Sequence, residues 1–412
     1  MRIVYFAVPY AGHINPNIPL FKELQKRKEE LVIFGDQEYI SWFIGNDYVK
    51  YIELPDYVKE YWKVSVLTEI QKVNYAEQYF SFIYDENLLK EKAYQENTLQ
   101  NRFYKEYMPI LEMLEPDCVI YDSYAFYMNK IIGYNKIKFL EINCAITVPD
   151  DYFNSSCWAE YIQNIVSKEV ENAPDIEKMR LIKKRMKRFH RRFLDEEATE
   201  KVEPYFFCYH SDLLQYQDDD SRVNPIYIGY DIEIQSKIKK DGSIFVSRGT
   251  MSDVYGIMML KNTLDSLNGM DYKVYTSLGK NEKAIQLLNN QTYKENIQIF
   301  SFVNQIEYLS KASIFITHGG ISGVRESILC KTPMIVCPAN YLDYMVGKAL
   351  EKAGAGILLD SRPLNSKDII DAVNYMNEKI DKFNIGIERI ATQLKETWDN
   401  AGIYRIINII NS

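Results

Sequence analysis

Two of the four histidines in this sequence stand just after apolar runs, where the strands of a parallel sheet would end. His13 follows the run 3–8, and His318 follows the run 313–317. Asp122 ends a third apolar run. Open parallel sheets bind their ligands at the carboxyl ends of the strands, so each of the three is a candidate site residue.

A histidine paired with a carboxylate has a definite chemistry. The carboxylate keeps one imidazole nitrogen protonated, leaves the other nitrogen to act as a general base, and stabilises the imidazolium that forms. His13 and Asp122 suit such a pair. Two plainer roles stay open: His13 as an ordinary turn residue, and Asp122 as the N-cap of a helix that begins near Ser123.

The segment around His318 has the layout of an anion-binding corner. An apolar strand ends in Gly319–Gly320, and a helix-compatible segment starts at once. The unpaired N–H groups and positive partial charge of a helix start attract phosphate, and glycine lets the backbone come close to a ligand. An ordinary strand–helix turn is the alternative. Glu326 lies one helical turn beyond Ser322, where a carboxylate could accept hydrogen bonds from a ribose.

Three further strand ends in the second half carry suitable groups. Ser247–Thr250 is a small, hydroxyl-bearing turn that suits phosphate oxygens, and Arg248 within it either adds charge or points to solvent. Phe302 is either a platform for a nucleotide base or an ordinary core residue. Asp343 follows Pro338 by a short loop and is placed for a sugar hydroxyl.

Each half of the chain must supply a sheet to position these residues. Apolar runs alternate with helix-like segments, which predicts parallel sheets with helices on both faces. Asn15 is expected to cap the first helix, which runs to Arg27 with Pro16 at its first position. The expected strands are 3–8, 31–35, 48–54, 117–121, 138–143 and 226–228 in the first half, and 243–247, 272–276, 297–301, 313–317, 333–337 and 356–359 in the second.

A chain of 412 residues is too long for one ordinary core, so we expect two domains. The predicted boundaries are a first domain over 1–225, a lysine-rich linker over 226–242 and a second domain over 243–395. A C-terminal helix over 396–412 is expected to pack back on the first domain.

Composition narrows the class of protein. A hydrophobic content of 47% and a net charge of −8 indicate a globular protein and argue against a nucleic-acid binder. The six cysteines lack a Cys-x-x-Cys pair and are interpreted as free thiols of a cytoplasmic protein, without a disulfide frame or metal site. The acidic run 218–220 is interpreted as a surface loop rather than a metal site. The basic segment 178–193 is interpreted as a solvated helix face in preference to a membrane-binding one.

Beside these observations stands a resemblance to a known family. Gly12–His13–Ile14–Asn15–Pro16 matches the family motif Gly-His-(Val/Ile)-Asn-Pro, and the stretch from Phe302 through His318 to Asp343 resembles its donor signature. By these motifs the chain resembles the inverting UDP-glycosyltransferases, most closely the bacterial branch that glycosylates macrolides, flavonoids and other small molecules. The resemblance covers nearly the whole length and implies the α/β GT-B fold, with two facing Rossmann-like domains and a cleft between them.

The resemblance assigns roles to individual residues. His13 would be the catalytic base and Asp122 its partner in a metal-independent, inverting transfer of a hexose to a small aromatic or macrocyclic acceptor bound by the first domain. The nucleotide sugar would be a co-substrate on the second domain, with no further cofactor. The implied donor-binding residues are Gly12, Ser247, Gly249, Thr250, Phe302, Val303, Gln305, His318, Gly320, Ile321, Ser322, Gly323, Glu326, Asn340, Asp343 and Tyr344.

Departures from the family pattern fall on the donor side. Phe302 and Asn304 replace a tryptophan and a proline, and Tyr344 replaces a glutamine. Gly347 and Gly323 replace an asparagine and a serine. UDP-glucose is therefore the default donor, with another UDP-sugar or a dTDP-sugar as alternatives. The rival functions are a lipid or cell-wall glycosyltransferase, a nucleotide-sugar epimerase and a non-catalytic partner of another transferase. The expected assembly is a monomer or a homodimer.

Overall fold

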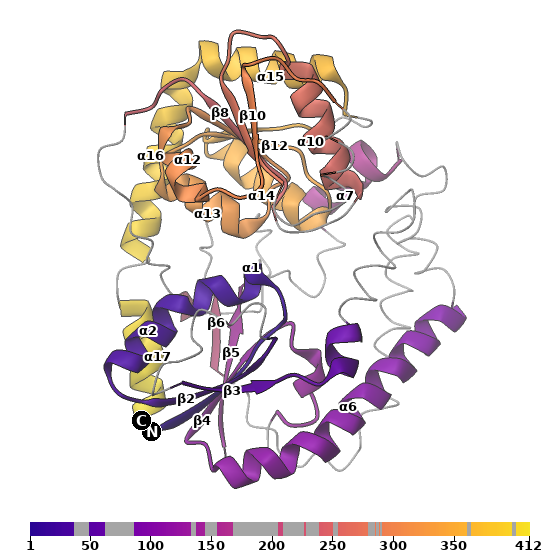
Figure 1. Ribbon diagram of the computed structural model, residues 1–412, viewed down its shortest axis with the longest axis vertical. Coiled ribbons are helices and arrows are strands. Elements are labelled where there is room, and N and C mark those ends of the chain that lie inside the picture. The colour runs from indigo at the N-terminus through magenta and orange to yellow at the C-terminus, as the bar shows by residue number, and fades with distance from the viewer. Residues whose placement is uncertain are drawn as a thin grey trace.

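The computed structural model has two lobes, each built around one β-sheet (Figure 1). The structure describes residues 1–36, 49–61, 86–132, 137–144, 155–167, 205–208, 226–227, 239–249, 254–278, 285, 288, 291–360, 364–397 and 401–412. Thr250, the basic segment 178–193 and the acidic run 218–220 lie outside these residues.

The first sheet has the strand order β3-β2-β1-β4-β5-β6-β7, and all of its neighbouring strands are parallel. Its strands are β1 (Arg2–Phe6), β2 (Glu30–Gly35), β3 (Val49–Glu53), β4 (Cys118–Asp122), β5 (Lys138–Asn143), β6 (Tyr205–Cys208) and β7 (Ile226–Tyr227). β1, β2 and β4 are rich in apolar residues and are buried along nearly their whole length on both faces, as expected for a parallel sheet between helices.

The second sheet has the order β10-β9-β8-β11-β12-β13, again with parallel neighbours. Its strands are β8 (Ile244–Ser247), β9 (Val274–Ser277), β10 (Ile297–Phe300), β11 (Ile314–Thr317), β12 (Met334–Val336) and β13 (Gly356–Leu358). Numbered within its own domain, this is the order 3-2-1-4-5-6 of doubly wound dinucleotide-binding folds. The first six strands of the first sheet have the same order, which confirms the two Rossmann-like sheets predicted from the sequence.

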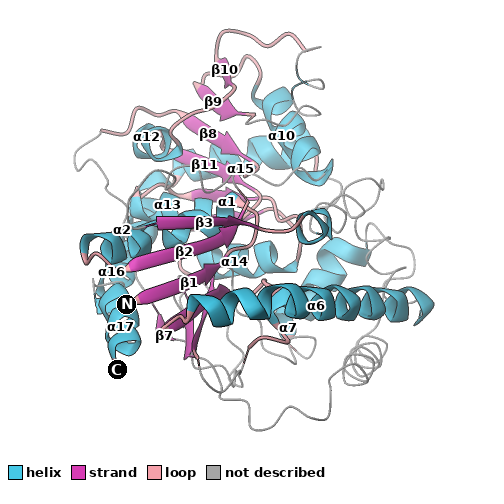
Figure 2. Cartoon of the chain, turned by 60° about the horizontal axis from the view of Figure 1, so that its bottom comes forward, coloured by secondary structure: helices cyan, strands magenta, loops and turns pink. Residues whose placement is uncertain are grey.

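Helices cover both faces of each sheet. Those of the first half are α1 (Ala11–Ile14), η1 (Asn15–Asn17), α2 (Ile18–Lys26), α6 (Glu86–Leu114), η2 (Phe126–Met128), α7 (Ser156–Tyr161) and η4 (Ile162–Val166). Those of the second half are α10 (Val254–Leu267), α12 (Gln305–Lys311), α13 (Ile321–Leu329), α14 (Tyr341–Lys352), α15 (Ser366–Glu378), α16 (Ile380–Thr397) and α17 (Ala401–Asn411). In Figure 2, α6 runs beside the strands of the first sheet, where its Leu99 and Phe103 pack against Val4 and Phe6.

Two segments belong by packing to the lobe at the other end of the sequence. α7 and η4 come from the first half, yet Trp158 and Ile165 share a core with Val324 and Tyr344 of the second lobe. α17 comes last in the chain, yet its Ile406 shares a core with the strands of the first sheet. Figure 1 shows both crossings. The first half of the chain is therefore not a single packing unit, because 155–167 packs with the second sheet.

Local details differ from the sequence-based prediction. The first helix begins at Ala11 rather than after Asn15, because the carbonyl of Tyr10 accepts hydrogen bonds from the N–H groups of His13 and Ile14 at 3.0 and 3.1 Å. β6 was not predicted. Ile226–Tyr227, the start of the predicted linker, pairs with β6 as the last strand of the first sheet. Within the described residues, none of the helices has the length and apolar character needed to cross a membrane.

Candidate active site

The first half of the candidate site is a histidine–aspartate pair. β1 and β4 are adjacent and parallel, so the loop after β1 and the end of β4 meet at one edge of the sheet. There His13 Nδ1 lies 2.9 Å from Asp122 Oδ2, with the aspartate fully buried and the His13 side chain 21% exposed. Asp122 Oδ1 accepts the N–H of Tyr124 at 2.8 Å. Asp122 thus both contacts the histidine and holds the turn that follows β4.

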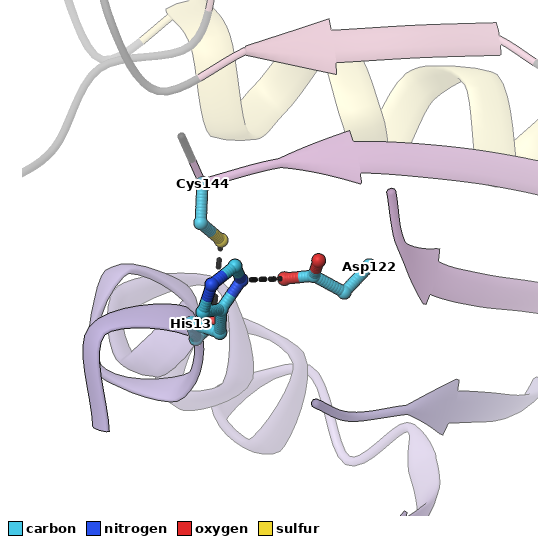
Figure 3. A group of neighbouring side chains, drawn as sticks. All are labelled: His13, Asp122 and Cys144. Atoms are coloured by element: carbon cyan, nitrogen blue, oxygen red, sulfur yellow. Dashed lines mark hydrogen bonds and ion pairs between the residues drawn. The ribbon is translucent and has the colours of Figure 1, made fainter. Parts of the chain in front are cut away.

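Asn17 and Cys144 fix the backbone around this pair. The buried Asn17 amide donates to the His13 carbonyl at 2.8 Å, to the Tyr5 hydroxyl at 2.9 Å and to Cys144 Sγ at 3.4 Å. The Cys144 thiol in turn donates to the His13 carbonyl at 3.2 Å. Figure 3 shows His13, Asp122 and Cys144 converging from a helix and two strands. Burial raises the pKa of the Cys144 thiol well above its ordinary value, and the negative charge of Asp122 acts in the same direction.

The second half of the site is the glycine turn after β11. β8 and β11 pair with Thr317 opposite Ser247, which brings the turn after β8 beside the turn after β11. The His318 ring lies between the two turns: a Cβ on Gly320 would stand 2.4 Å from its Nε2, and one on Gly249 would stand 2.7 Å from its Cε1. Gly249 also has φ +73°. Glycine at both positions is therefore what makes room for the imidazole.

The start of α13 carries the predicted nucleotide residues. Gly320 is its N-cap, and among the described residues no side chain caps the first turn, which suits the predicted binding of an anion by the N–H groups of a helix start. Gln305 Nε2 donates to Glu326 Oε2 at 2.6 Å, so two residues predicted to border the nucleoside lie together. Burial raises the pKa of Glu326 above its ordinary value, against the opposing hydrogen bond from Gln305 and the charge of Arg325.

The start of α14 lies beside the same turn. Asn340 caps this helix by accepting the Asp343 N–H at 3.1 Å, and Asp343 Oδ2 accepts the Ala339 N–H at 3.2 Å. A Cβ on Gly319 would stand 3.2 Å from Asp343 Cβ, so the helix start and the glycine turn are in contact. Both predicted residues therefore hold the wall of the turn, in addition to any contact with a sugar.

Tyr344, which the family resemblance assigns to donor binding, packs against the segment 155–167. Its side chain is fully buried, its ring lies 5.5 Å from that of Tyr161, and its hydroxyl accepts a hydrogen bond from Asn164 at 3.4 Å. Residues 155–167 pack against this side chain, so Tyr344 contributes to the core between them and α14, and its contact with the donor stays a prediction. Packing explains the glycine at position 347, because a Cβ there would stand 2.5 Å from Leu358 Cδ1.

The remaining predicted residues differ in how exposed they are. Phe302 is 77% exposed at the end of β10, which excludes the core role and leaves its ring accessible. Among the described residues, a Cβ on Gly12 would meet no atom within 4 Å, which leaves open space around its Cα. Arg248 is buried and its guanidinium donates to the Leu278 carbonyl at 3.5 Å, so it does not point to solvent. The residues at intermediate depth along the same edge are Val303, Ile321, Ser322 and Gly323.

Sequence reasoning missed two buried polar residues. Asn17 lies four residues after His13, and in a helix this spacing puts both side chains on one face. That spacing could have identified Asn17 from the sequence. Arg325 on α13 is fully buried, and its guanidinium donates to Ser322 Oγ at 3.4 Å. Its positive charge acts on the Cys144 thiol of the first lobe and on Glu326 of the second.

Comparison with known proteins shows which proteins the chain resembles. Residues 226–397 match the glycosyltransferase family 28 C-terminal domain. The uncharacterized UDP-glucosyltransferase YojK of Bacillus subtilis is 22% identical over 92% of this chain and 90% of its own. Over most of its length the chain is thus similar to bacterial UDP-glycosyltransferases, and residues 226–397 match a glycosyltransferase domain. A second Bacillus subtilis protein, the uncharacterized UDP-glucosyltransferase YdhE, is 30% identical over 40% of each chain.

Solved structures support the GT-B fold over the whole length. The spinosyn rhamnosyltransferase SpnG superposes with a TM-score of 0.70 at 14% identity, covering 99% of this chain and 100% of its own. SpnG has also been solved with thymidine diphosphate, and that structure has a TM-score of 0.68 to this chain at the same identity, covering 99% of this chain and all of its own. Fold and family resemblance are thus confirmed, and the chain is a glycosyltransferase.

Proposed function

We propose that this glycosyltransferase moves a hexose from a UDP-sugar, UDP-glucose by default, to a hydroxyl of a small aromatic or macrocyclic acceptor with inversion. The observation that carries the proposal is the 2.9 Å contact between His13 Nδ1 and the buried Asp122 carboxylate. A carboxylate in this position keeps Nδ1 protonated, so Nε2 becomes the proton acceptor. That is the arrangement of a general base.

The proposed step is a single displacement. The acceptor oxygen forms a bond to the anomeric carbon as its proton passes to His13 Nε2, and the bond from that carbon to the diphosphate oxygen breaks. Asp122 stabilises the imidazolium that results. The start of α13 and His318 stabilise the negative charge that grows on the leaving diphosphate. Because protein groups supply this stabilisation, the proposed step needs no metal ion.

The nucleotide is proposed to lie along the turns after β8, β10 and β11. The accessible ring of Phe302 would stack on the base, and the Gln305–Glu326 pair would bind the ribose. The diphosphate would lie at Gly320, and Asp343 beside Gly319 would meet the sugar. A dTDP-sugar stays as the alternative donor, since SpnG has been solved with thymidine diphosphate and Tyr344 replaces the glutamine of the family pattern.

Acceptor-dependent release of the nucleoside diphosphate tests the proposal. UDP- and dTDP-sugars should be incubated with phenolic, macrolide and lipid acceptors, and the products analysed by mass spectrometry and NMR for the linkage. A β-glycoside from an α-linked donor is expected. His13→Ala should lower turnover by about 10²–10⁴-fold while donor binding persists. Asp122→Asn should lower turnover with its fold intact. Turnover that is unchanged in His13→Ala would remove this residue from the mechanism, and donor consumption without any acceptor would favour an epimerase.

A non-catalytic partner of another transferase is the second candidate. The altered donor residues are its support, because Phe302, Tyr344 and Gly347 depart from the family pattern. The intact contact between His13 and Asp122 argues against it. Donor binding without turnover, in the presence of the whole acceptor panel, would favour this candidate over the enzyme.

A further inference from the structure

Cys144 lies beside the pair formed by His13 and Asp122, and the proposed reaction does not use the chemistry of its thiol. One ligand atom each of His13, Asp122 and Cys144 lies within 4.8 Å of the other two, and this is the only such group of three among the described residues. The three side chains come from different elements, the helix α1, the end of β4 and the residue after β5 (Figure 3). The fold, rather than a local motif, brings them together.

We propose that His13, Asp122 and Cys144 form an inhibitory binding site for Zn²⁺. An imidazole nitrogen, a carboxylate oxygen and a thiolate are the ligands that zinc takes in proteins, and three protein ligands plus one exchangeable position is a common zinc arrangement. Mg²⁺ and Ca²⁺ prefer oxygen ligands, so a set that includes sulfur selects zinc over them.

A tetrahedral ion would require small shifts of three ligand atoms that already lie within 4.8 Å of one another. Zinc bonds of about 2.0–2.3 Å at a tetrahedral angle place neighbouring ligand atoms about 3.5 Å apart. His13 Nδ1 and Asp122 Oδ2 are 2.9 Å apart and would separate by a few tenths of an ångström. Cys144 is already held toward the pair by its hydrogen bonds to the His13 carbonyl and from Asn17.

Charge balance favours the ion in this buried place. Zn²⁺ bound by the Asp122 carboxylate and the Cys144 thiolate is neutral overall, and the thiol proton passes to solvent as the ion binds. The Asn17 amide, which donates to Cys144 Sγ at 3.4 Å, would then hydrogen-bond the thiolate as an outer contact. Asp122 and Cys144 are buried and His13 is partly exposed, so the ion would enter past the imidazole.

Inhibition follows from which nitrogen the ion takes. A neutral histidine with zinc on Nδ1 carries its proton on Nε2, and that nitrogen then cannot accept the proton of the acceptor hydroxyl. This consequence rests on the proposed function, whereas binding of the ion does not. The two can therefore be measured separately.

Binding is tested with Co²⁺ as a spectroscopic substitute for zinc. The wild type should bind one Co²⁺ with a thiolate-to-cobalt charge-transfer band that Zn²⁺ abolishes. Cys144→Ser should lose the band and bind about 100-fold or more weakly, since even loss of an outer contact weakens metal sites about 10–100-fold. Cys330→Ser, which removes another buried thiol from the second lobe, is the matched control and should keep the band. Thermal unfolding without metal should show that both variants fold.

Zinc-edge X-ray absorption of the loaded wild type gives a second measurement that needs no variant. One sulfur and two or three nitrogen or oxygen neighbours are expected, and a shell without sulfur would overturn the proposal. An equal cobalt affinity in the wild type and Cys144→Ser would overturn it as well. In turnover assays, micromolar Zn²⁺ should inhibit the wild type, a chelator should restore its activity, and Cys144→Ser should resist. If no donor and acceptor are turned over, the proposed function fails while the cobalt and X-ray results still decide the site.

Discussion

At the residue scale, Glu326 combines a proposed binding role with an unfavourable place for a charge. Its carboxylate accepts a hydrogen bond from Gln305 at 2.6 Å, yet burial keeps the pKa of Glu326 above its ordinary value of 4.5. The folded state therefore binds this proton more tightly than the unfolded chain. The resulting stability is fully present below pH 4.5 and is lost as the pH rises through the folded-state pKa.

Glu326→Gln tests both features. The variant keeps the shape of the side chain without its charge. The wild type should lose stability between pH 4 and pH 7 as Glu326 ionises, whereas Glu326→Gln should not, so the free energy of unfolding of the variant relative to the wild type should rise over this range, as measured by urea denaturation. The same variant should raise the KM of the nucleotide sugar, because an amide accepts ribose hydroxyls less strongly than a carboxylate. A stability difference that does not change with pH would contradict the assigned burial effect.

A substitution at Gly320 tests whether the position of the His318 ring matters for activity. Its φ is −58°, so alanine brings no backbone strain, but the new methyl group would stand 2.4 Å from His318 Nε2. Gly320→Ala should displace the imidazole and lower kcat/KM by on the order of 10²-fold, the usual effect of an ångström-scale misplacement. Asp371→Ala, at an exposed position of α15, is the control. Equal activities of the two variants would mean that His318 does not bind the donor.

At the element scale, the sequence was informative where strands are buried on both faces. Continuous apolar runs such as 314–317 predicted nearly every strand of the two sheets, because burial demands the same chemistry along the whole strand. The strand ends then located His13, Asp122 and His318. The start of the first helix was wrong because Asn15–Pro16 is a strong local capping signal, whereas hydrogen bonds to Tyr10 close an earlier turn.

The docking of 155–167 on α14 could not be predicted, because its partners are about 180 residues away in the sequence. Trp158 meets the Tyr341 ring edge-on at 4.8 Å, Ser155 Oγ lies 3.1 Å from the Tyr341 hydroxyl, and Asn164 donates to Asp360 at 2.8 Å. Amphipathic spacing predicts that a helix is buried, but it does not name the surface that covers it.

Trp158→Ala measures what this docking contributes. The indole is almost fully buried in the core of the second lobe, so its truncation should lower the free energy of unfolding by about 3–5 kcal/mol. Glu160 lies on the same segment as Trp158 and forms a partly exposed ion pair with Lys348 of α14. Glu160→Gln breaks this ion pair and should change the stability by less than about 1 kcal/mol. Denaturant titrations compare the two. Similar small effects would show that the segment is not held on α14 in solution.

At the scale of the whole molecule, each lobe is completed by a segment that the other end of the chain supplies. α7 and η4 complete the core of the second lobe, and α17 completes that of the first. The Lys138 ammonium donates to the Ile409 carbonyl at 2.7 Å, which fixes the end of α17 to β5. The two chain termini lie side by side on the first lobe (Figure 1). Neither lobe can therefore lose its borrowed segment without exposing apolar core.

Ile406 shows whether these crossings make the lobes unfold together. It is fully buried against the first sheet, so Ile406→Ala should cost about 2–5 kcal/mol, whereas the exposed Arg405→Ala on the same helix should cost little. Because α17 follows α16 after a short connection, loss of α17 packing frees the end of the second lobe as well. Hydrogen exchange followed by mass spectrometry should thus show faster opening in peptides from both 1–36 and 364–397. Faster exchange confined to 1–36 would mean that the lobes are independent, and that the borrowed segments stabilise each sheet without coupling the two halves of the active site.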